Sequence, residues 1–324
     1  MRVIRGILAV VVAAALVGAC GDEQEEVTVG LIVKRNTNPF WVTMKDTAEA
    51  TADDDNVKLL TAAGKSDIDN DSQVAALAKM TADGAKGLMI TPADSKAIVP
   101  AIEKARQAGV TVIALDTPTE PESAVDALFA TNNQQAGELI GRYAKAKATE
   151  RGIKPRIAML DLSPGITSGE LRRQGFLEGF GGTPEIVGSV DTLGETARAA
   201  DGLRALLEKD DGINVVYTVN EPAAFGAIQA LKAAGIGDDD VILVSVDGGC
   251  DAVKDGVRPG VIDATAQQYP ENMARLGVEA LAGAARGGAK PTGFKNTGVE
   301  LITGDAASGV PSKDVAFGVR NCWG

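Results

Sequence analysis

The sequence predicts an α/β protein made of two lobes, each a doubly wound parallel sheet. From Val27 onward, short β-branched runs such as VTVGLIV, GLMI and TVIALD alternate with alanine-rich stretches of helical periodicity. Strands that alternate with helices of this length form βαβ units, whose parallel sheets are covered on both faces. The roughly 300 residues beyond the N-terminal segment exceed the usual size of one domain.

The strand–helix pattern runs twice along the chain. It restarts after AKATERGIKP with RIAMLDL, NVVYTV and VILVSVD. One layout is shared by GLMITPADSKAIVPAIEKARQAGVTVIALD and VVYTVNEPAAFGAIQALKAAGIGDDDVILVSVD. Each gives a strand, a polar loop, an alanine-rich helix ending in Ala-Gly, and a second strand ending in aspartate, Asp116 or Asp247. Two similar lobes explain this echo better than one large sheet.

Residues 1–19 are predicted to be an export signal that is not part of the fold. Arg2 and Arg5 precede an uncharged run that is shorter than the roughly 20 apolar residues of a membrane-spanning helix. The following VGAC resembles a bacterial lipobox, which implies cleavage before Cys20 and a lipid anchor on it. Residues 20–26 would then form a tether, and the mature protein is expected to be extracytoplasmic and anchored to the bacterial cell membrane. A plain secretory signal with an incidental cysteine is the alternative.

The composition argues against several classes of function. The chain has no histidine, which is the residue most often used in general acid–base catalysis, in catalytic triads and in zinc sites. These classes of function are therefore disfavoured. We therefore expect no metal and no cofactor. Removing Arg2 and Arg5 takes the formal charge from −12 to −14. Such acidity argues against nucleic-acid binding, which needs a basic surface.

Two cysteines remain beyond the predicted anchor, Cys250 and Cys322. In an exported protein such a pair forms a disulfide more often than a metal site. A bridge between them would attach the C-terminal segment NCWG to the body of the protein. Two free thiols are the alternative.

Polar residues gather where the predicted strands end. In an open parallel sheet, ligands bind in the crevice beyond the carboxyl ends of the strands, so two facing lobes share one cleft. Each sugar hydroxyl is both a donor and an acceptor, so fixed carboxylates and amides engage adjacent hydroxyls in pairs. For each acid taken singly, a helix cap is the alternative. The mixture nevertheless predicts a polyhydroxylated ligand held by Lys34, Arg35, Asp94, Asp116, Asn220, Asp247 and Gln268.

The segment NTNPFW places two aromatic residues beside the first strand of the chain. Asn38 is a good helix N-cap and Pro39 suits the first helical position, so a helix is predicted to start there. Phe40 and Trp41 then lie in the first turn, at the mouth of the cleft. They either contact the ligand or form the buried face of the helix together with Met44.

The acidic stretch DIDND, residues 67–71, has carboxylates at alternate positions like a calcium loop. Ser72 stands where that loop requires glycine, and Ala78 stands where it requires a bidentate acid. We therefore interpret the stretch as a solvated helix N-terminus.

Six motifs in the right order resemble the type I periplasmic sugar-binding proteins, the ribose-binding-like receptors of ABC importers. They are NTNPFWVTMKDTAEA, TPADSKAIVPAI, VIALDTP, VNEPAAFGAIQAL, VSVDGG and ATAQQYPENM. The resemblance covers essentially all of residues 27–324. It implies that Asn38, Phe40 and Trp41 line the first lobe with Asp116. Asn220, Asp247 and Gln268 would serve the second lobe and the hinge.

The resemblance also implies an arginine directed at the sugar. Arg172, within ELRRQGF, is our choice, and Arg173 is the rival because the sequence does not fix the helix register. Lys34 and Arg35 replace small polar residues of the ribose-binding pattern. Thr91 stands where ribose binders have Asn, and Thr117 stands where they have Arg, so ribose itself is doubtful. LIVKRNTNPFW, LDTPTEP, VDGGC and the terminal CWG are most similar to the fructose-binding branch, which favours a ketose or a related sugar or polyol.

Three crossover segments would form the hinge, near Thr131-Asn132, 266–268 and Gly293. They divide the chain into a first lobe of 27–131 plus 268–293 and a second lobe of 132–267 plus 294–324. Sugar binding would stabilise a hinge-closed monomer that a membrane permease recognises.

Two other classes of function fit parts of the pattern. An exported glycosidase could use Asp116 and Asp247 as paired carboxylates, although the surrounding arginine and amides would keep both ionised and leave no proton donor. A receptor for chemosensing or for a small autoinducer would share the fold and the cleft.

Overall fold

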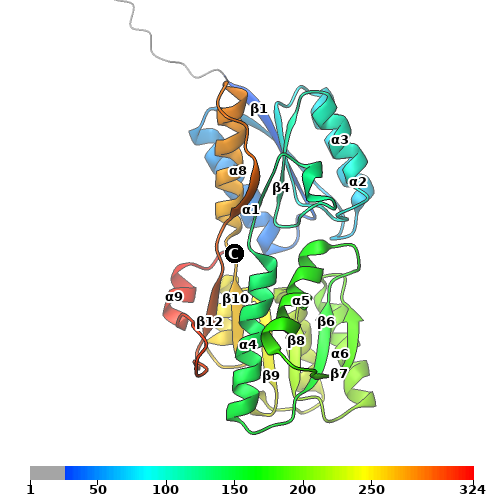
Figure 1. The fold of residues 1–324 in the computed structure, drawn as a ribbon, viewed down its shortest axis with the longest axis vertical. Helices are drawn as coiled ribbons and strands as arrows, with labels where there is room; N and C mark the ends of the chain where they lie inside the picture. The colour runs from blue at the N-terminus through cyan, green and yellow to red at the C-terminus, as the bar shows by residue number, and fades with distance from the viewer. Residues whose placement is uncertain (1–25) are drawn as a thin grey trace, which may run out of the picture.

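The computed structural model describes residues 26–324 as two lobes stacked end to end (Figure 1). Each lobe contains a six-stranded sheet covered by helices on both faces. The predicted α/β class with two parallel-sheet lobes is therefore confirmed. The predicted signal peptide, the Cys20 anchor and residues 20–25 of the tether lie outside the described residues. Among the helices of residues 26–324, none has the length and apolarity needed to cross a membrane.

The first lobe is built on a sheet whose strands are all parallel. The strands are β1 (Val27–Val33), β2 (Val57–Ala63), β3 (Gly87–Ile90), β4 (Thr111–Leu115), β5 (Ala127–Ala130) and β11 (Gly293–Asn296), in the order β11-β5-β4-β3-β1-β2. Helices α1 (Pro39–Asp54) and α8 (Pro270–Ala285) cover one face, and α2 (Asn70–Ala82) and α3 (Val99–Gln107) cover the other. A short 3₁₀ turn, η1 (Glu122–Ala124), precedes β5.

The second lobe repeats this design with one antiparallel edge strand. Its strands are β6 (Arg156–Asp161), β7 (Glu185–Asp191), β8 (Val215–Thr218), β9 (Ile242–Asp247), β10 (Ala264–Gln267) and β12 (Glu300–Thr303), in the order β12-β10-β9-β8-β6-β7. Only β12 runs antiparallel to its neighbour. The helices are α4 (Asn133–Glu150) paired with α5 (Thr167–Phe180), α6 (Thr196–Lys209) paired with α7 (Glu221–Ala233), and α9 (Val315–Arg320). The turns η2 (Asp238–Asp240) and η3 (Ala252–Val257) flank β9.

Three crossings connect the lobes. The chain passes from β5 to α4 at residues 131–132, from β10 to α8 at 268–269, and from β11 to β12 at 297–299. The predicted third boundary, at 293, is wrong by a few residues because β11 pairs with β5 of the first sheet, with Phe294 opposite Leu128 and Asn296 opposite Ala130. All four residues of β11 are exposed, so the sequence GFKN lacks the apolar pattern by which a strand is recognised.

Helix α1 begins where the sequence predicts it. The Asn38 side chain accepts a hydrogen bond from the backbone N–H of Phe40 at 2.9 Å, and Pro39 occupies the first helical position. This cap satisfies one of the free N–H groups at the start of the helix. It also fixes Phe40 and Trp41 in the first turn, directly beyond the end of β1.

Helices α4 and α5 approach each other so closely that glycine is required at the contact. A Cβ atom on Gly137 would lie 2.0 Å from the carbonyl oxygen of Arg172, and one on Gly175 would lie 2.0 Å from that of Gln134. Any side chain at either position would therefore push the helices apart. The close contact brings Arg172 of α5 beside Asn133, the first residue of α4.

Candidate ligand-binding site

The two lobes face each other with the carboxyl ends of their parallel strands, and they touch. The Arg35 side chain donates a hydrogen bond to the carbonyl oxygen of Gly194 in the other lobe at 2.8 Å. The hydroxyl oxygens of Thr117 and Ser168 lie 3.0 Å apart across the same cleft. These contacts make this the closed form of the hinge.

The closed cleft contains a small polar cavity, which we call the inner pocket. Its free volume is about 20 Å³, room for about one water molecule. Both lobes contribute to its lining, which consists of Lys34, Asn38, Phe40, Trp41, Asp67, Asp116, Leu162, Ser168, Arg172, Asn220 and Asp247. Eight of the twelve residues predicted to bind ligand therefore line one cavity.

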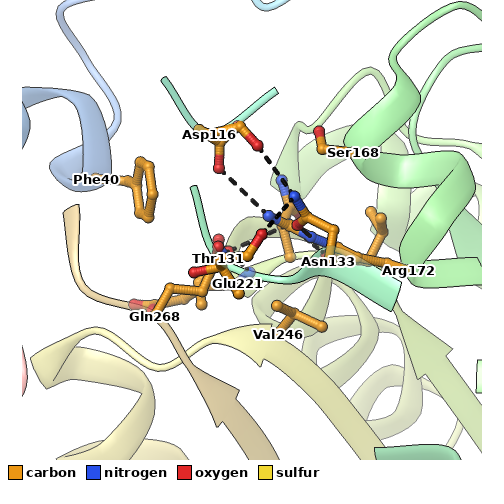
Figure 2. A network of polar contacts seen from close by, with 12 residues as sticks. Phe40, Asp116, Thr131, Asn133, Ser168, Arg172, Glu221, Val246 and Gln268 are labelled. Atoms are coloured by element: carbon orange, nitrogen blue, oxygen red, sulfur yellow. Dashed lines mark hydrogen bonds and ion pairs between the residues drawn. The ribbon is translucent and has the colours of Figure 1, made fainter. Parts of the chain in front are cut away.

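Arg172 lies at the centre of the polar contacts (Figure 2). Its Nε donates to Asn133 Oδ1 at 2.8 Å, and its Nη1 donates to the carbonyl oxygen of Val219 at 3.0 Å. Nη1 also lies 3.3 Å from Asp247 Oδ1, and Nη2 lies 3.5 Å from Asp116 Oδ1. Because Asn133 and Val219 hold the guanidinium in place, it is oriented before any ligand arrives. Arg173, the rival residue, instead pairs with Asp161 outside the pocket.

The two strand-end aspartates share an unusual backbone conformation. Asp116 has φ of 60° and Asp247 has φ of 102°, in the left-handed region that residues other than glycine rarely adopt. Such strain persists only where the surroundings enforce it, and it gathers at functional sites. At Asp247, Gln268 donates to Oδ1 at 2.7 Å and the backbone N–H of Glu221 donates to Oδ2 at 3.1 Å. Burial raises the pKa of Asp247, although the Arg172 charge opposes that shift.

Lys34 is a buried cation with unused hydrogen-bonding capacity. Its side chain is 2% exposed, and within residues 26–324 its Nζ donates one hydrogen bond, to Thr117 Oγ1 at 3.2 Å. The ammonium also lies 5.4 Å from the centroid of the Trp41 ring. Burial lowers the pKa of Lys34, while the carboxylates of Asp116 and Asp67 act in the opposite direction. An ammonium has three donors, so acceptors on a ligand would complete its coordination.

Phe40 and Trp41 form part of the buried face of α1 and also border the inner pocket. They are 2% and 5% exposed and pack in the core cluster that contains Met44, yet both also line the inner pocket. The two rings meet edge to face, with centroids 4.7 Å apart. Trp41 Nε1 donates to Asp67 Oδ1 at 3.2 Å, so its polar edge is satisfied.

Four predicted residues do not line the inner pocket. Gln268 lies behind it, bonded to Asp247. Arg35 lies at the rim, with its Nε 3.2 Å from Asp67 Oδ1. Thr91 is fully buried beyond the end of β3, and Asp94 caps the following turn by accepting from two backbone N–H groups. For Asp94 the helix-cap alternative is therefore the one that the structure shows.

Sequence reasoning missed three polar residues of this site. Asp67 belongs to the acidic stretch interpreted as a solvated helix start, yet it is 4% exposed and its pKa is raised by burial. It follows β2 by four residues, so the rule that ligands bind beyond strand ends could have found it. Ser168 lies four residues before Arg172 on α5 and so shares its helix face. No local sequence pattern marks Asn133 as a site residue, because it contacts Arg172 only through the packing of α4 on α5.

The C-terminal segment is attached to the second lobe and reaches the first. The structure joins Cys250 and Cys322 by a disulfide, with Cα atoms 4.8 Å apart. The next residue, Trp323, donates from Nε1 to the carbonyl oxygen of Gln268 at 2.9 Å. Its ring meets Phe40 edge to face at 5.1 Å. Trp323 therefore supports one of the two aromatic residues of the inner pocket.

Comparison with known proteins agrees with this geometry. A model of the periplasmic binding protein domain matches residues 29–289. The ribose import binding protein RbsB of Escherichia coli K12 is 30% identical over 255 residues, which cover 78% of this chain and 82% of that protein. A D-ribose/D-allose-binding protein of Pseudomonas aeruginosa is 28% identical over 294 residues, covering 87% and 90%. An ABC transporter solute binding protein from Agrobacterium vitis with bound D-fucose superposes with a TM-score of 0.79 at 25% identity, covering 85% and 95%.

Proposed function

The chain belongs to the periplasmic binding protein domain family and is a type I periplasmic sugar-binding protein, and on that premise we propose that it captures a monosaccharide or polyol for delivery to a membrane permease. Members of this family and its neighbours are solute-binding proteins, not enzymes. The glycosidase alternative is thereby excluded.

One observation carries the proposal: a fixed guanidinium between two carboxylates in a cavity with aromatic walls. Asp116 and Asp247 approach Arg172 from different lobes, and Phe40 and Trp41 present apolar rings beside them. Carboxylates accept from sugar hydroxyls, the guanidinium donates to them, and ring faces suit the C–H face of a sugar. Hydrogen bonds to charged groups contribute about 1.5–3 kcal/mol each, so four or five supply the ~8 kcal/mol of a micromolar complex after ordering costs.

Hinge motion is required for the sugar to enter. The inner pocket of this closed form has room for about one water, which is far less than a sugar ring occupies. The lobes must therefore separate to admit the ligand, and they then close around it to a slightly wider spacing than the one seen here. The permease recognises the liganded closed form.

The ligand is proposed to be a ketose such as fructose, or a related sugar or polyol. Lys34 and Thr117 replace residues typical of ribose binders, and they lie next to each other at the pocket, where the Thr117 hydroxyl also contacts Asp116 at 2.7 Å. The buried Lys34 ammonium requires an acceptor-rich ligand. The curated relatives are named for ribose, allose and apiose, so the panel of candidates includes aldoses.

The family implies an extracytoplasmic location. We extend this to a monomer held at the cell membrane by a lipid on Cys20, because a lipobox-like VGAC precedes a short acidic stretch. Incorporation of labelled palmitate in the native protein and its loss in Cys20→Ala tests the anchor.

A thermal-shift screen tests the function. A ligand that binds only the folded state raises the melting temperature, so pentoses, hexoses, ketoses, polyols and sugar acids are compared at one concentration. We expect at least one neutral sugar or polyol to raise the Tm by several degrees and calorimetry to give a micromolar or tighter Kd. If no compound in the panel shifts the Tm, the proposal fails.

A further inference from the structure

A second and larger cavity lies beside the inner pocket, and we call it the outer chamber. Its free volume is about 340 Å³, and residues of both lobes line it. Thr37 and Pro39 of the first lobe are exposed at its rim. The second lobe contributes Glu195, Glu221, Phe225 and Trp323, among others.

The outer chamber adjoins the inner pocket directly. Asn38 lines both cavities. On the second lobe, Glu221 of the chamber donates its backbone N–H to Asp247 Oδ2 of the inner pocket at 3.1 Å. Trp323 of the chamber touches Phe40 of the inner pocket, with ring centroids 5.1 Å apart. A group that leaves the inner pocket past Asn38 therefore enters the chamber.

The chamber wall is rigidly built. Glu221 is 8% exposed, and its carboxyl group accepts a hydrogen bond from the backbone N–H of Gly249 at 2.7 Å. A Cβ atom on Gly249 would lie 2.7 Å from that carboxyl group and 3.0 Å from the Trp323 ring, so the backbone runs in contact with both. Trp323 is held in turn by the carbonyl oxygen of Gln268 and by the neighbouring disulfide.

The chemistry of the wall selects a ring that carries hydroxyl groups. The carboxyl groups of Glu195 and Glu221 and the threonine hydroxyls offer polar oxygen atoms, which pair with the hydroxyl groups of a sugar. Phe225 and Trp323 offer apolar faces, on which the C–H face of a sugar ring packs. The one arginine of the wall, Arg35, already bonds Gly194 and Asp67. A cavity of this size lies in the range that encloses a small molecule.

We propose that the ligand is a sugar bearing a second, glycosidically linked ring, with the first ring in the inner pocket and the second in the outer chamber. This inference rests on the proposed function and narrows it from a free monosaccharide to a glycoside or disaccharide. The rim residues Thr37 and Pro39 leave the far end of the second ring in contact with solvent.

Calorimetry with matched sugar pairs tests the inference. The probes are the monosaccharide that gives the largest thermal shift and its disaccharides, in which a glucosyl or galactosyl ring is attached in turn at each hydroxyl. We expect at least one disaccharide to bind about 10-fold or more tightly than the parent monosaccharide. Thr37→Trp, which fills the chamber from its exposed rim, should remove that gain while the monosaccharide affinity stays within 2-fold. Phe225→Ala should reduce the same gain by removing one ring face.

Thr61→Trp is the matched control, since Thr61 is an exposed threonine of β2 in the same lobe and is not part of the chamber lining. It should leave both affinities unchanged. If the monosaccharide binds but every linked ring weakens binding or leaves it equal, the inference is overturned and the proposed function stands. If neither monosaccharides nor disaccharides bind, the proposed function fails and the inference with it.

Discussion

Arg172 and Asp116 face each other across the cleft, with 3.5 Å between Nη2 and Oδ1, although they belong to different lobes. The same guanidinium lies 3.3 Å from Asp247 of its own lobe. In the proposed hinge opening, Arg172 would separate from Asp116 but stay with Asp247 and Asn133 of its own lobe. On this proposal the second lobe would present an oriented cation–carboxylate pair to an entering ligand, and Asp116 would complete the site on closure.

Asp247→Asn should weaken binding strongly while preserving the fold. The amide keeps the shape of the side chain but removes the charge that Arg172 faces. Losing a charged partner of the ligand costs about 2–4 kcal/mol, which corresponds to roughly a 30- to 1,000-fold higher Kd by calorimetry with the best sugar of the screen. Asp238→Asn, in an exposed turn, is the control. An unchanged Kd in Asp247→Asn would remove this residue from the site.

Trp41 should report ligand binding by its fluorescence. The chain has only two tryptophans, Trp41 and Trp323, so Trp323→Phe leaves Trp41 as the single emitter. Because Trp41 lines the inner pocket, a saturating sugar should change its emission intensity or wavelength. Indifference of this signal to a sugar that binds by calorimetry would assign Trp41 to the core alone.

Arg35→Ala should loosen the closed form. The variant loses the hydrogen bond to Gly194 and the 4.0 Å ion pair with Glu195, both of which cross the cleft. We expect about 10-fold weaker binding, mainly through faster dissociation in stopped-flow measurements. Small-angle scattering should show a larger radius of gyration without sugar. Arg204→Ala, which removes an exposed pair within α6, should change neither quantity. Identical kinetics in Arg35→Ala and native protein would exclude this role.

Glu221 should make stability depend on pH. Burial raises its pKa from 4.5 to about 8, so between these values the folded protein holds a proton that the unfolded chain releases. Stability contributed by this group is therefore fully present below pH 4.5 and declines as the pH rises toward 8, by at most about 1.4 kcal/mol per pH unit.

Thermal unfolding from pH 5 to 9 measures this effect. The native protein should lose several degrees of Tm more than Glu221→Gln, which keeps the shape but does not titrate. Asp263, whose pKa is raised to about 6, titrates in both proteins, so it does not contribute to the difference. Parallel curves for the two proteins would show that Glu221 ionises normally.

Reducing the Cys250–Cys322 disulfide should lower stability and also affinity. The bridge closes a loop of 72 residues, for which the chain-entropy estimate is about 4 kcal/mol. Release of the C-terminal segment also frees Trp323 from Phe40, so the inner pocket loses a support. We expect the double variant Cys250→Ser/Cys322→Ser to melt several degrees lower and to bind sugar more weakly. Native protein with a reducing agent serves as the comparison, and equal Tm and Kd in all samples would contradict the prediction.

Local patterns in the amino-acid sequence were sufficient to predict several features of this protein. Strand and helix periodicity predicted the two lobes, and the repeated layout marked Asp116 and Asp247 as equivalent strand ends. Asn38 and Pro39 placed the start of α1 because capping is a local hydrogen-bonding property. These features depend on neighbours within a few residues, which a single sequence contains.

The set of side chains that converge on the site depends on packing between distant segments of the chain. The register of α5 against α4, set by close glycine contacts, chose Arg172 over Arg173. The fold also turned Asp67 from an apparently solvated residue into a buried partner of Trp41, and it brought Trp323 to Phe40 from 283 positions away in the chain. Such contacts arise from packing between distant segments, and no local pattern in the chain encodes them.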